Sequence, residues 1–308
     1  MAAARQRQFM NTWGPVLHGN DIMPIIHFLQ GQGVIAVNKV CRFCNQPMAI
    51  SAYRDVLDGH KWRCPRPCQR TLSLRDGSFF AQWPKIRLGR LFMVIYYWSN
   101  KIGVTKIETM TDLPLKTVIA VCQSLRTVCG NHLQRNPIVV GGGGFVVQID
   151  ETMMHHRQRN GVGRAAQQPV WVFGMVDTQF TPARGYMEIV QRRDRATLTG
   201  VINRNLAANS TIHSDSWAAY NNLPLHVPNC IQHDRVNHRY HFVDPNTGAH
   251  TQNIESYWNR FKHGIKSMKG VRRVDLTSYL KEFIWRDWYG LDAPLDNIIQ
   301  AINIDYPL

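Results

Sequence analysis

Four of the seven cysteines in this 308-residue chain occur as two close pairs, and their spacing restricts the fold around them. Cys41 and Cys44 form the first pair, in "CRFC"; Cys64 and Cys68 form the second, in "CPRPC", with nineteen residues between the two pairs. Two such pairs are typical of a tetrahedral site in which four thiolates hold one structural Zn²⁺. Two disulfides are the alternative, but nothing in the sequence indicates secretion, and the cytosol and nucleus keep thiols reduced.

The segment between the pairs, "NQPMAISAYRDVLDGHKWR", alternates like short strands around an Asp-Gly turn. We therefore expect a zinc ribbon over residues 37–80. The other three cysteines, Cys122, Cys129 and Cys230, stand in apolar surroundings and are predicted to be buried.

The net charge of +15 is unevenly distributed along the chain. Residues 1–149 hold 18 Lys and Arg against 6 Asp and Glu, a balance of +12, whereas residues 150–308 hold 18 against 15, a balance of +3. A basic front half favours a module that binds a polyanion such as DNA. A merely basic soluble protein and a binder of acidic membranes are the alternatives. No membrane anchor, lipidation signal or run of eighteen apolar residues supports a membrane partner.

Three helices are predicted after the ribbon, from "KIRLGRLFMVIYYWSN", "GVTKIETMTDL" and "PLKTVIAVCQSLRTVCGNHLQR". A short helix, a tight turn and a longer helix favour a helix-turn-helix-like DNA-binding domain over residues 84–136, although a plain three-helix bundle fits the same pattern. The longer helix would then read the major groove, with Lys116 and Arg126 as candidate DNA contacts.

The predicted secondary structure changes from helices to strands after "GGGG", at residues 141–144. Three strands ("FVVQID", "VWVFGMVD", "RGYMEIVQ") precede a helix, a fourth strand ("STIHSD"), a helix, a fifth strand ("CIQHD") and a long helix. This order predicts a ribonuclease-H-like α/β domain over residues 145–290. Residues 1–36 and the C-terminal tail, residues 291–308, have no assigned role, although an apolar stripe in the tail makes it a candidate for contacts between chains.

Three acidic residues stand where this fold would bring them together. Asp150 ends the first strand, Asp215 ends the fourth, and Glu255 lies on the helix after the fifth. Carboxylates repel one another unless cations neutralise them, and oxygen ligands without cysteine point to Mg²⁺ or Mn²⁺. Two such ions can activate a nucleophile and stabilise the leaving oxygen in phosphoryl transfer. The adjacent Glu151 is expected on the opposite strand face, and Asp177 is expected to cap a turn.

Apolar residues at helical spacing predict an amphipathic helix over residues 250–270, which carries Glu255 and is otherwise basic. No Lys or Arg stands three or four positions from this acid, so an ion pair along the helix is excluded, whereas a favourable effect of the helix N-terminus stays possible. The candidate DNA contacts around it are Lys262, Lys266, Arg272, Arg273 and His250, although a structural role for His250 is as reasonable.

The motifs "QIDET", "IHSDSWAAY", "VNHRYHF" and "HTQNIESYWNRFKHGIKSMKGVRR" resemble those of Merlin-type DDE transposases and their bacterial insertion-sequence relatives. The resemblance implies a DDE triad of Asp150, Asp215 and Glu255, with 64 and 39 residues between them, and a zinc-binding N-terminal region. It also implies a cut-and-paste enzyme that binds terminal inverted repeats in double-stranded DNA, cleaves there and joins the 3′-hydroxyl to target DNA.

Two other functions remain open at this point: a ribonuclease-H-like nuclease, and a domesticated DNA-binding protein that has kept the fold. For a transposase, two ends must be cut and joined together, so a homodimer or higher homo-oligomer is expected. Such an enzyme would act in the nucleus of a eukaryote, the favoured case, or in the cytoplasm and nucleoid of a bacterium.

Overall fold

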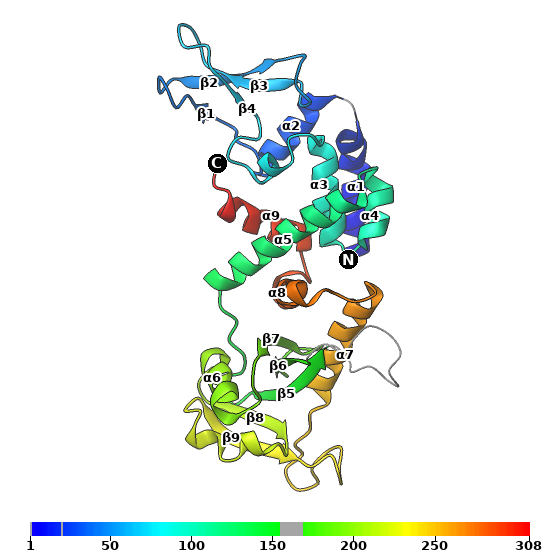
Figure 1. Cartoon of the computed structure of the whole chain (residues 1–308), viewed down its shortest axis with the longest axis vertical. Helices are drawn as coiled ribbons and strands as arrows, with labels where there is room; N and C mark the ends of the chain where they lie inside the picture. Colours follow the sequence, from blue (N-terminus) through cyan, green and yellow to red (C-terminus); the bar gives the residue numbers. More distant parts are fainter. Residues whose placement is uncertain (1, 20, 155–168) are drawn as a thin grey trace. The chain divides into compact units, whose positions relative to one another are not determined.

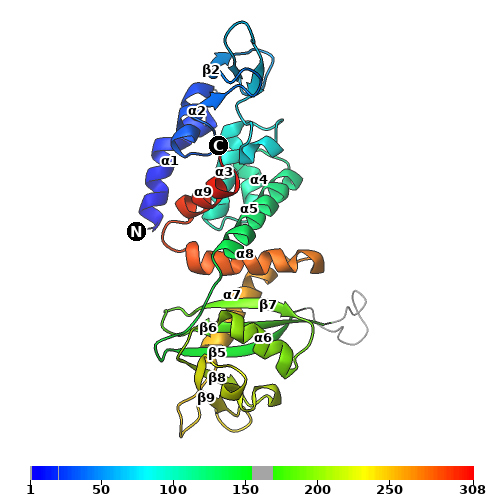
Figure 2. The ribbon, with the colours of Figure 1, turned by 90° about the vertical axis from the view of Figure 1, so that its left-hand side faces the viewer.

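The computed structural model describes residues 2–19, 21–154 and 169–308 (Figures 1 and 2). The chain divides into two compact units. Unit 1 comprises Met1–His132 and Tyr289–Leu308, and unit 2 comprises Leu133–Trp288. Within the described ranges, no helix is both long and apolar enough to cross a lipid bilayer.

Unit 1 is built around one buried helix. Its helices are α1 (Ala2–His18), α2 (Ile22–Gly31), α3 (Leu88–Ser99), α4 (Val104–Thr111), α5 (Leu115–Arg135, whose end belongs to unit 2) and α9 (Pro294–Asp305), with a 3₁₀ turn η1 (Phe79–Gln82). Every residue of α3 except Arg90 is buried, and α1, α4 and α9 pack against it. A Cβ at Gly89 would lie 2.2 Å from the carbonyl oxygen of Leu17, so α1 approaches α3 at a position that only glycine allows.

The helices expected after the ribbon are confirmed as α3, α4 and α5. Helix α1 was not foreseen, because its mixed sequence has a weak apolar stripe; Phe9 nevertheless stacks on Tyr96 of α3, with the ring centroids 4.3 Å apart. The apolar residues of the C-terminal tail, Ile298, Ile299 and Ile302, are buried on α9 within unit 1. They therefore form part of this core and are not an open surface for a second chain.

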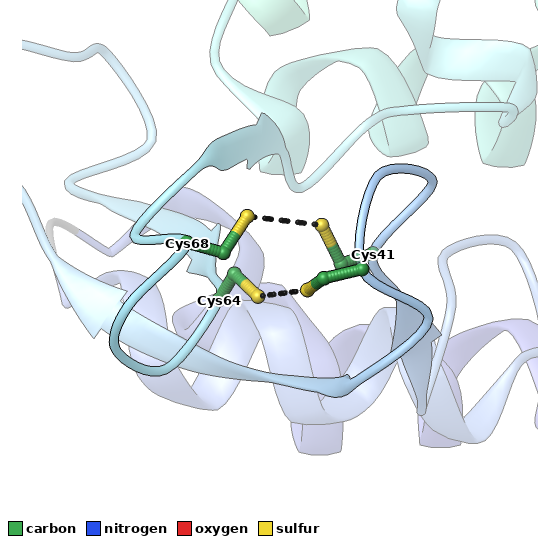
Figure 3. A group of neighbouring side chains, drawn as sticks. Cys41, Cys64 and Cys68 are labelled. Atoms are coloured by element: carbon green, nitrogen blue, oxygen red, sulfur yellow. Dashed lines mark hydrogen bonds between the residues drawn. The ribbon is translucent and has the colours of Figure 1, made fainter.

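The cysteine-bearing segment of unit 1 is an antiparallel sheet, β1 (Lys39–Val40), β2 (Pro47–Ala52), β3 (His60–Arg63) and β4 (Thr71–Ser73), in the order β1-β2-β3-β4. Loops 41–46 and 64–70 close its outer hairpins and carry the two cysteine pairs. All four Sγ atoms lie within 4.8 Å of one another (Figure 3). The expected convergence of the four cysteines is thus confirmed, and all are free thiols.

A buried ion pair fastens this sheet to the segment before α3. The Arg75 guanidinium donates to both oxygens of Asp58 and also to the carbonyl oxygens of Trp83 and Ile86. Both charged side chains are almost wholly buried. Because the guanidinium is saturated with acceptors, its desolvation is compensated and the pair fixes one arrangement of sheet and helix.

Unit 2 contains a five-stranded mixed sheet, with β5 (Val146–Met154), β6 (Val170–Asp177), β7 (Arg184–Val190), β8 (Ser210–Asp215) and β9 (Cys230–Val236) in the order β7-β6-β5-β8-β9. Strands β5, β6 and β7 pair antiparallel, whereas β8 runs parallel to both β5 and β9. The expectation that the first and fourth strands are neighbours is confirmed.

The helices of unit 2 are α6 (Arg195–Asn205), α7 (Gln252–Ser267) and α8 (Leu276–Tyr289), with 3₁₀ turns η2 (Ala218–Tyr220), η3 (Leu223–Leu225) and η4 (Arg273–Asp275). Helix α7 packs on β5 and β6, and Figure 2 shows α6 on the opposite side of the sheet. One expectation was wrong: the helix between the fourth and fifth strands is replaced by η2 and η3, since Asn222 is left-handed and Pro224 follows it.

Candidate active site

The register of β5 and β8 places two of the three acids on one face of the sheet. Gln148 pairs with His213 across these parallel strands. Asp150 and Asp215 each follow two residues later, so both point to the same face as that pair. This is the face that α7 covers, because Trp258 Nε1 of α7 donates to Asp150 Oδ2 at 3.0 Å.

The ionised form of Asp150 is disfavoured by its surroundings. Burial, together with the negative charges of Asp215 and Glu255, raises the pKa of this carboxyl to about 6, against the stabilising hydrogen bond from Trp258. The three acids therefore share one electrostatic neighbourhood. They are not packed at coordination distance: among the described residues, the four cysteines are the group of three or more potential metal ligands that lies within 4.8 Å.

Helix α7 begins against a polar side chain of β5. Gln148 is fully buried, and its Oε1 accepts hydrogen bonds from the backbone N–H groups of Asn253 (2.9 Å) and Ile254 (3.2 Å). Thr251, the residue before the helix, makes no such cap. Since Oε1 must face the helix, Nε2 of Gln148 donates to His250 Nδ1 at 3.2 Å. The proton of a neutral His250 is therefore on Nε2.

A glycine on β6 makes room for this helix. Gly174 pairs with Asp150 across β5 and β6. A Cβ at Gly174 would lie 2.5 Å from the Trp258 ring and 3.3 Å from Ile254, so a side chain there would push α7 off the sheet. Gln148 and Gly174 together set the height of α7 above Asp150.

Glu255 stands one turn into α7 and is about half exposed. Its Oε1 accepts a hydrogen bond from the Thr251 hydroxyl at 3.1 Å. His238 Nε2 lies 2.8 Å from that hydroxyl and 3.8 Å from Glu255 Oε1. Because the hydroxyl gives its one proton to Glu255, His238 is the donor to Thr251. No Lys or Arg of the described chain pairs with Glu255, which agrees with the sequence.

Glu151 and Asp177 lie where the strand pattern predicted. Glu151 is buried on the face opposite Asp150, 3.7 Å from Arg193 Nη2, and burial raises its pKa to about 7 despite that positive charge. Asp177 is buried and accepts hydrogen bonds from the N–H groups of Gly141 and Gln179, so it caps a turn.

The residues that were expected to contact DNA differ in their exposure to solvent. Lys262 and Lys266 are exposed on α7, and Lys116 is exposed on α5. Arg126 is only 5% exposed and donates to Gln123 Oε1 at 2.7 Å, so the expectation that it contacts DNA is corrected: an Arg held in the interior cannot present its guanidinium to phosphate.

Arg272 and Arg273 do not continue the surface of α7. The helix ends at Ser267, and Lys269 and Gly270 then take left-handed conformations. Both arginines are exposed beyond that break, and Arg272 Nε donates to Asp275 at 2.6 Å. The apolar pattern that extended the helix to residue 270 was misleading, since its last member, Met268, is 42% exposed.

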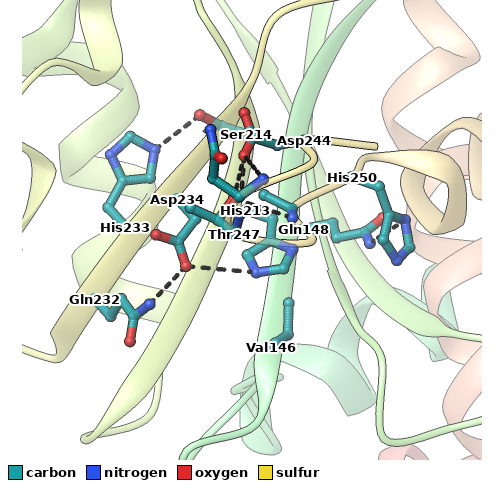
Figure 4. A network of polar contacts seen from close by, with 12 residues as sticks. Val146, Gln148, His213, Ser214, Gln232, His233, Asp234, Asp244, Thr247 and His250 are labelled. Atoms are coloured by element: carbon teal, nitrogen blue, oxygen red, sulfur yellow. Dashed lines mark hydrogen bonds and ion pairs between the residues drawn. The ribbon is translucent and has the colours of Figure 1, made fainter. Parts of the chain in front are cut away.

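A histidine network on β8 and β9 was missed by the sequence analysis (Figure 4). The rings of His213 and His250 lie 6.2 Å apart, and His213 Nε2 is 3.9 Å from Asp234 Oδ2. Burial lowers the pKa of His233 to about 4, so this ring is neutral, with Nε2 2.8 Å from Ser214 Oγ. Gln148, a lone amide inside an apolar strand, was the one sequence signal available for this region.

Gly174→Ala should destabilise unit 2 by about 1–3 kcal/mol, because the new Cβ overlaps the Trp258 ring. The tryptophan would also lose its hydrogen bond to Asp150. Chemical denaturation monitored by tryptophan fluorescence measures the change. Gly264→Ala on α7 is the matched control, since a Cβ there meets nothing within 4 Å and is expected to be neutral or slightly stabilising. Equal stabilities of the two variants would contradict the packing described.

Asp150→Asn should stabilise the protein at neutral pH in buffer without divalent cations. The folded pKa of about 6 exceeds the unfolded value near 3.9, so folded protein binds more protons between these values. Stability is therefore lost as pH rises through about 4 to 6, and removing the charge should recover about 3 kcal/mol above that range and nothing below about pH 4.

Thermal unfolding at several pH values measures this gain. The control is Asp194→Asn: Asp194 caps α6, and its pKa is lowered by the Thr197 N–H, so that variant should gain nothing. A neutral-pH stability of Asp150→Asn at or below that of the wild type would contradict the electrostatic description.

Comparison with known proteins agrees with this geometry. Residues 141–287 match the family described as "ISXO2-like transposase domain". No curated protein matches the chain. Among solved structures, an intasome of simian T-cell lymphotropic virus in complex with the PP2A regulatory subunit B56 gamma is 12% identical, covers 63% of this chain and 67% of its own, and has a TM-score of 0.31.

A pre-cleavage Mos1 transpososome is 7% identical, covers 70% of this chain and 78% of its own, and has a TM-score of 0.26. TM-scores this low do not establish a shared fold, so the family match carries the conclusion. The match to an ISXO2-like transposase domain over residues 141–287 agrees with the resemblance to DDE transposases that the sequence motifs indicated.

Proposed function

We propose that this chain is a cut-and-paste DNA transposase with a ribonuclease-H-like catalytic domain, whose catalytic carboxylates are Asp150, Asp215 and Glu255. One observation carries the proposal. Within the region that matches a transposase domain, Asp150 and Asp215 share one face of the sheet and Glu255 lies on the helix that covers this face. Among the described residues, neither aspartate has an ion-pair partner. A nuclease would account for the carboxylates, and a DNA-binding protein would account for the basic residues of the first half. A transposase accounts for both features.

The donor set fits hard divalent cations. The carboxylates supply only oxygen ligands. Burial and then the charges of Asp215 and Glu255 raise the pKa of Asp150, and a bound cation would relieve this cost of ionisation. Two Mg²⁺ or Mn²⁺ ions, when bound, would polarise the scissile phosphate and lower the pKa of the attacking hydroxyl or water. Asp150, Asp215 and Glu255 would hold them.

The chain's own residues would perform the other tasks. Trp258 holds one oxygen of Asp150 by its hydrogen bond, and Thr251 orients Glu255. His250 carries its proton on Nε2, where it can donate to a phosphate oxygen. Lys262 and Lys266 would neutralise phosphates of the bound strand, which adds affinity that falls as salt rises.

DNA-end recognition is proposed for unit 1. Helix α4, the turn 112–114 and helix α5 have the lengths of a helix-turn-helix, and Lys116 is exposed at the start of the longer helix. The balance of +12 over residues 1–149 supports binding to terminal inverted repeats. We expect at least two chains on paired ends, because one chain has one triad.

Asp150→Ala, Asp215→Ala and Glu255→Ala should each abolish DNA strand cleavage in Mg²⁺ or Mn²⁺ while leaving end binding largely intact. Each removes an oxygen ligand from unit 2, and the proposed reading helix is in unit 1. The substrate is the DNA selected by the protein from a random pool, assayed for nicking on gels. Asp194→Ala, which removes an exposed acid outside the site, is the control. Wild-type cleavage by any triad variant would refute that residue's assignment.

Purified protein should contain one tightly bound Zn²⁺ per chain. Four sulfurs around a tetrahedral Zn²⁺ are about 3.8 Å apart, and Cys41 and Cys68 Sγ are separated by 3.8 Å. The backbone N–H groups of Phe43 and Cys44 lower the pKa of Cys41 to about 6, which favours the thiolate that binds metal.

Cys41→Ser or Cys64→Ser should release this ion and unfold the ribbon, because the binding energy of such a site is largely its folding energy. Elemental analysis and near-UV circular dichroism measure both effects. Cys122→Ser, which alters a buried thiol away from the cluster, should retain the zinc. Well-folded wild-type protein without zinc would rule out the site.

A further inference from the structure

The segment between β9 and α7 leaves large aromatic side chains uncovered. Tyr240 is 69% exposed, Phe242 is 80% exposed, and the adjacent Val243 is 44% exposed. Single exposed apolar residues are common, whereas several on one loop favour a binding surface. The function proposed above does not use it.

The segment has a defined conformation. The Asn237 carbonyl accepts hydrogen bonds from the N–H groups of Tyr240 and His241, both at 3.0 Å, and the Asn237 side chain accepts from Arg239 N–H. Further on, Asp244 Oδ1 accepts from the backbone of residues 246 and 247 and from the Thr247 hydroxyl (Figure 4). The aromatic side chains between these two turns are thus presented on a built loop.

The same segment is linked by hydrogen bonds to Glu255, one of the three proposed catalytic carboxylates. His238 donates to the Thr251 hydroxyl, which in turn donates to Glu255. Tyr240 follows His238 by two residues. A strand whose phosphate lies at Glu255 would therefore have its neighbouring nucleotides within reach of this loop.

The charge of the loop selects the partner. The stretch 235–243, "RVNHRYHFV", holds two arginines and no acid, and it is flanked by Asp234 and Asp244. The nearest following acid, Asp244, uses Oδ1 within its own turn. Aromatic residues interleaved with cations on an open surface are the combination that binds single-stranded nucleic acid, where rings stack on bases and cations contact the backbone.

We propose that Tyr240 and Phe242 stack on unpaired bases of the DNA strand beside the cleavage site, with Arg239 contacting the adjoining phosphate. The proposal rests on the proposed function, because it takes the strand at Glu255 to be the substrate. The enzyme should therefore bind a locally opened duplex more tightly than a fully paired one. A base inside a paired duplex is stacked on its neighbours, so its face is free for an aromatic side chain only after the duplex opens.

The test compares DNA binding by the full chain in an Asp150→Ala background, which prevents cleavage. The probes are a fluorescent duplex with a central run of unpaired thymines and the same duplex fully paired. Phe242→Leu keeps apolar bulk and removes the aromatic face; it should weaken binding to the opened duplex about tenfold and leave the paired duplex unchanged. Phe242→Trp should retain the preference for the opened duplex.

Phe145→Leu is the matched control, because Phe145 is an exposed aromatic residue of the same unit, 48% exposed, outside this loop. It should behave as the parent protein. Equal binding of the two probes by the parent, or the same affinity loss on both probes for Phe242→Leu, would overturn the proposal. The proposal would also be overturned if Phe242→Leu changed the oligomer mass measured by light scattering without changing DNA affinity. That result would show that the loop contacts a second copy of the chain.

Cleavage supplies a separate readout. Phe242→Leu in the otherwise wild-type chain should cut a paired end slowly and a pre-opened end at nearly the wild-type rate; equal rates of wild type and variant on the paired end would contradict stacking. The binding comparison does not depend on cleavage. If Phe242→Leu loses the preference for opened DNA, the stacking role is supported even when the wild-type protein shows no cleavage. Absence of cleavage by the wild-type protein would refute the proposed catalysis and not the stacking.

Discussion

The amide of Gln148 is the contact on which the candidate site depends. It is buried inside the central strand β5, where an unpaired amide would cost on the order of 1–3 kcal/mol. It is satisfied only when α7 starts directly above it, because its acceptor takes two backbone N–H groups of that helix. The same requirement places Glu255 over the sheet and Trp258 against Asp150. One buried polar group therefore fixes both a helix and two catalytic candidates.

The far side of α7 is fixed by a second buried polar contact. Arg260 pairs with Asp287 of α8 at 3.3 Å, and Asp287 also accepts from the Gly185 N–H of β7. One of the basic residues of this helix is thus structural. Lys262 and Lys266 are exposed and remain available for the proposed contacts with DNA. Basic residues on one helix cannot be treated as a uniform DNA-binding surface.

Sequence reasoning predicted the elements with strong periodicity and placed Asp215 correctly at the end of its strand. It placed Asp150 at a strand end as well, whereas β5 continues to Met154. The strands β6 and β8 begin and end at the expected residues, and the adjacency of β5 and β8 followed from their order. It did not reach Gln148 as a helix cap, because that contact joins residues more than a hundred positions apart. Nor could it bury Arg126 or end α7 at Ser267, since an apolar period does not record where tertiary contacts stop.

Strand β5 carries two adjacent acids, the buried Glu151 and the partly buried Asp150, and their different surroundings support Asp150 as the proposed metal ligand. Glu151 has an internal cation: Arg193 lies 3.7 Å away and is itself held between the rings of Trp171 and Trp217. Asp150, on the other face, has a neutral indole donor and two acidic neighbours. A fold that supplies Arg193 to one acid and no cation to the other leaves the negative charge of Asp150 without a positive partner among the described residues. Alternation along the strand separates the two roles, because successive side chains cannot share a face.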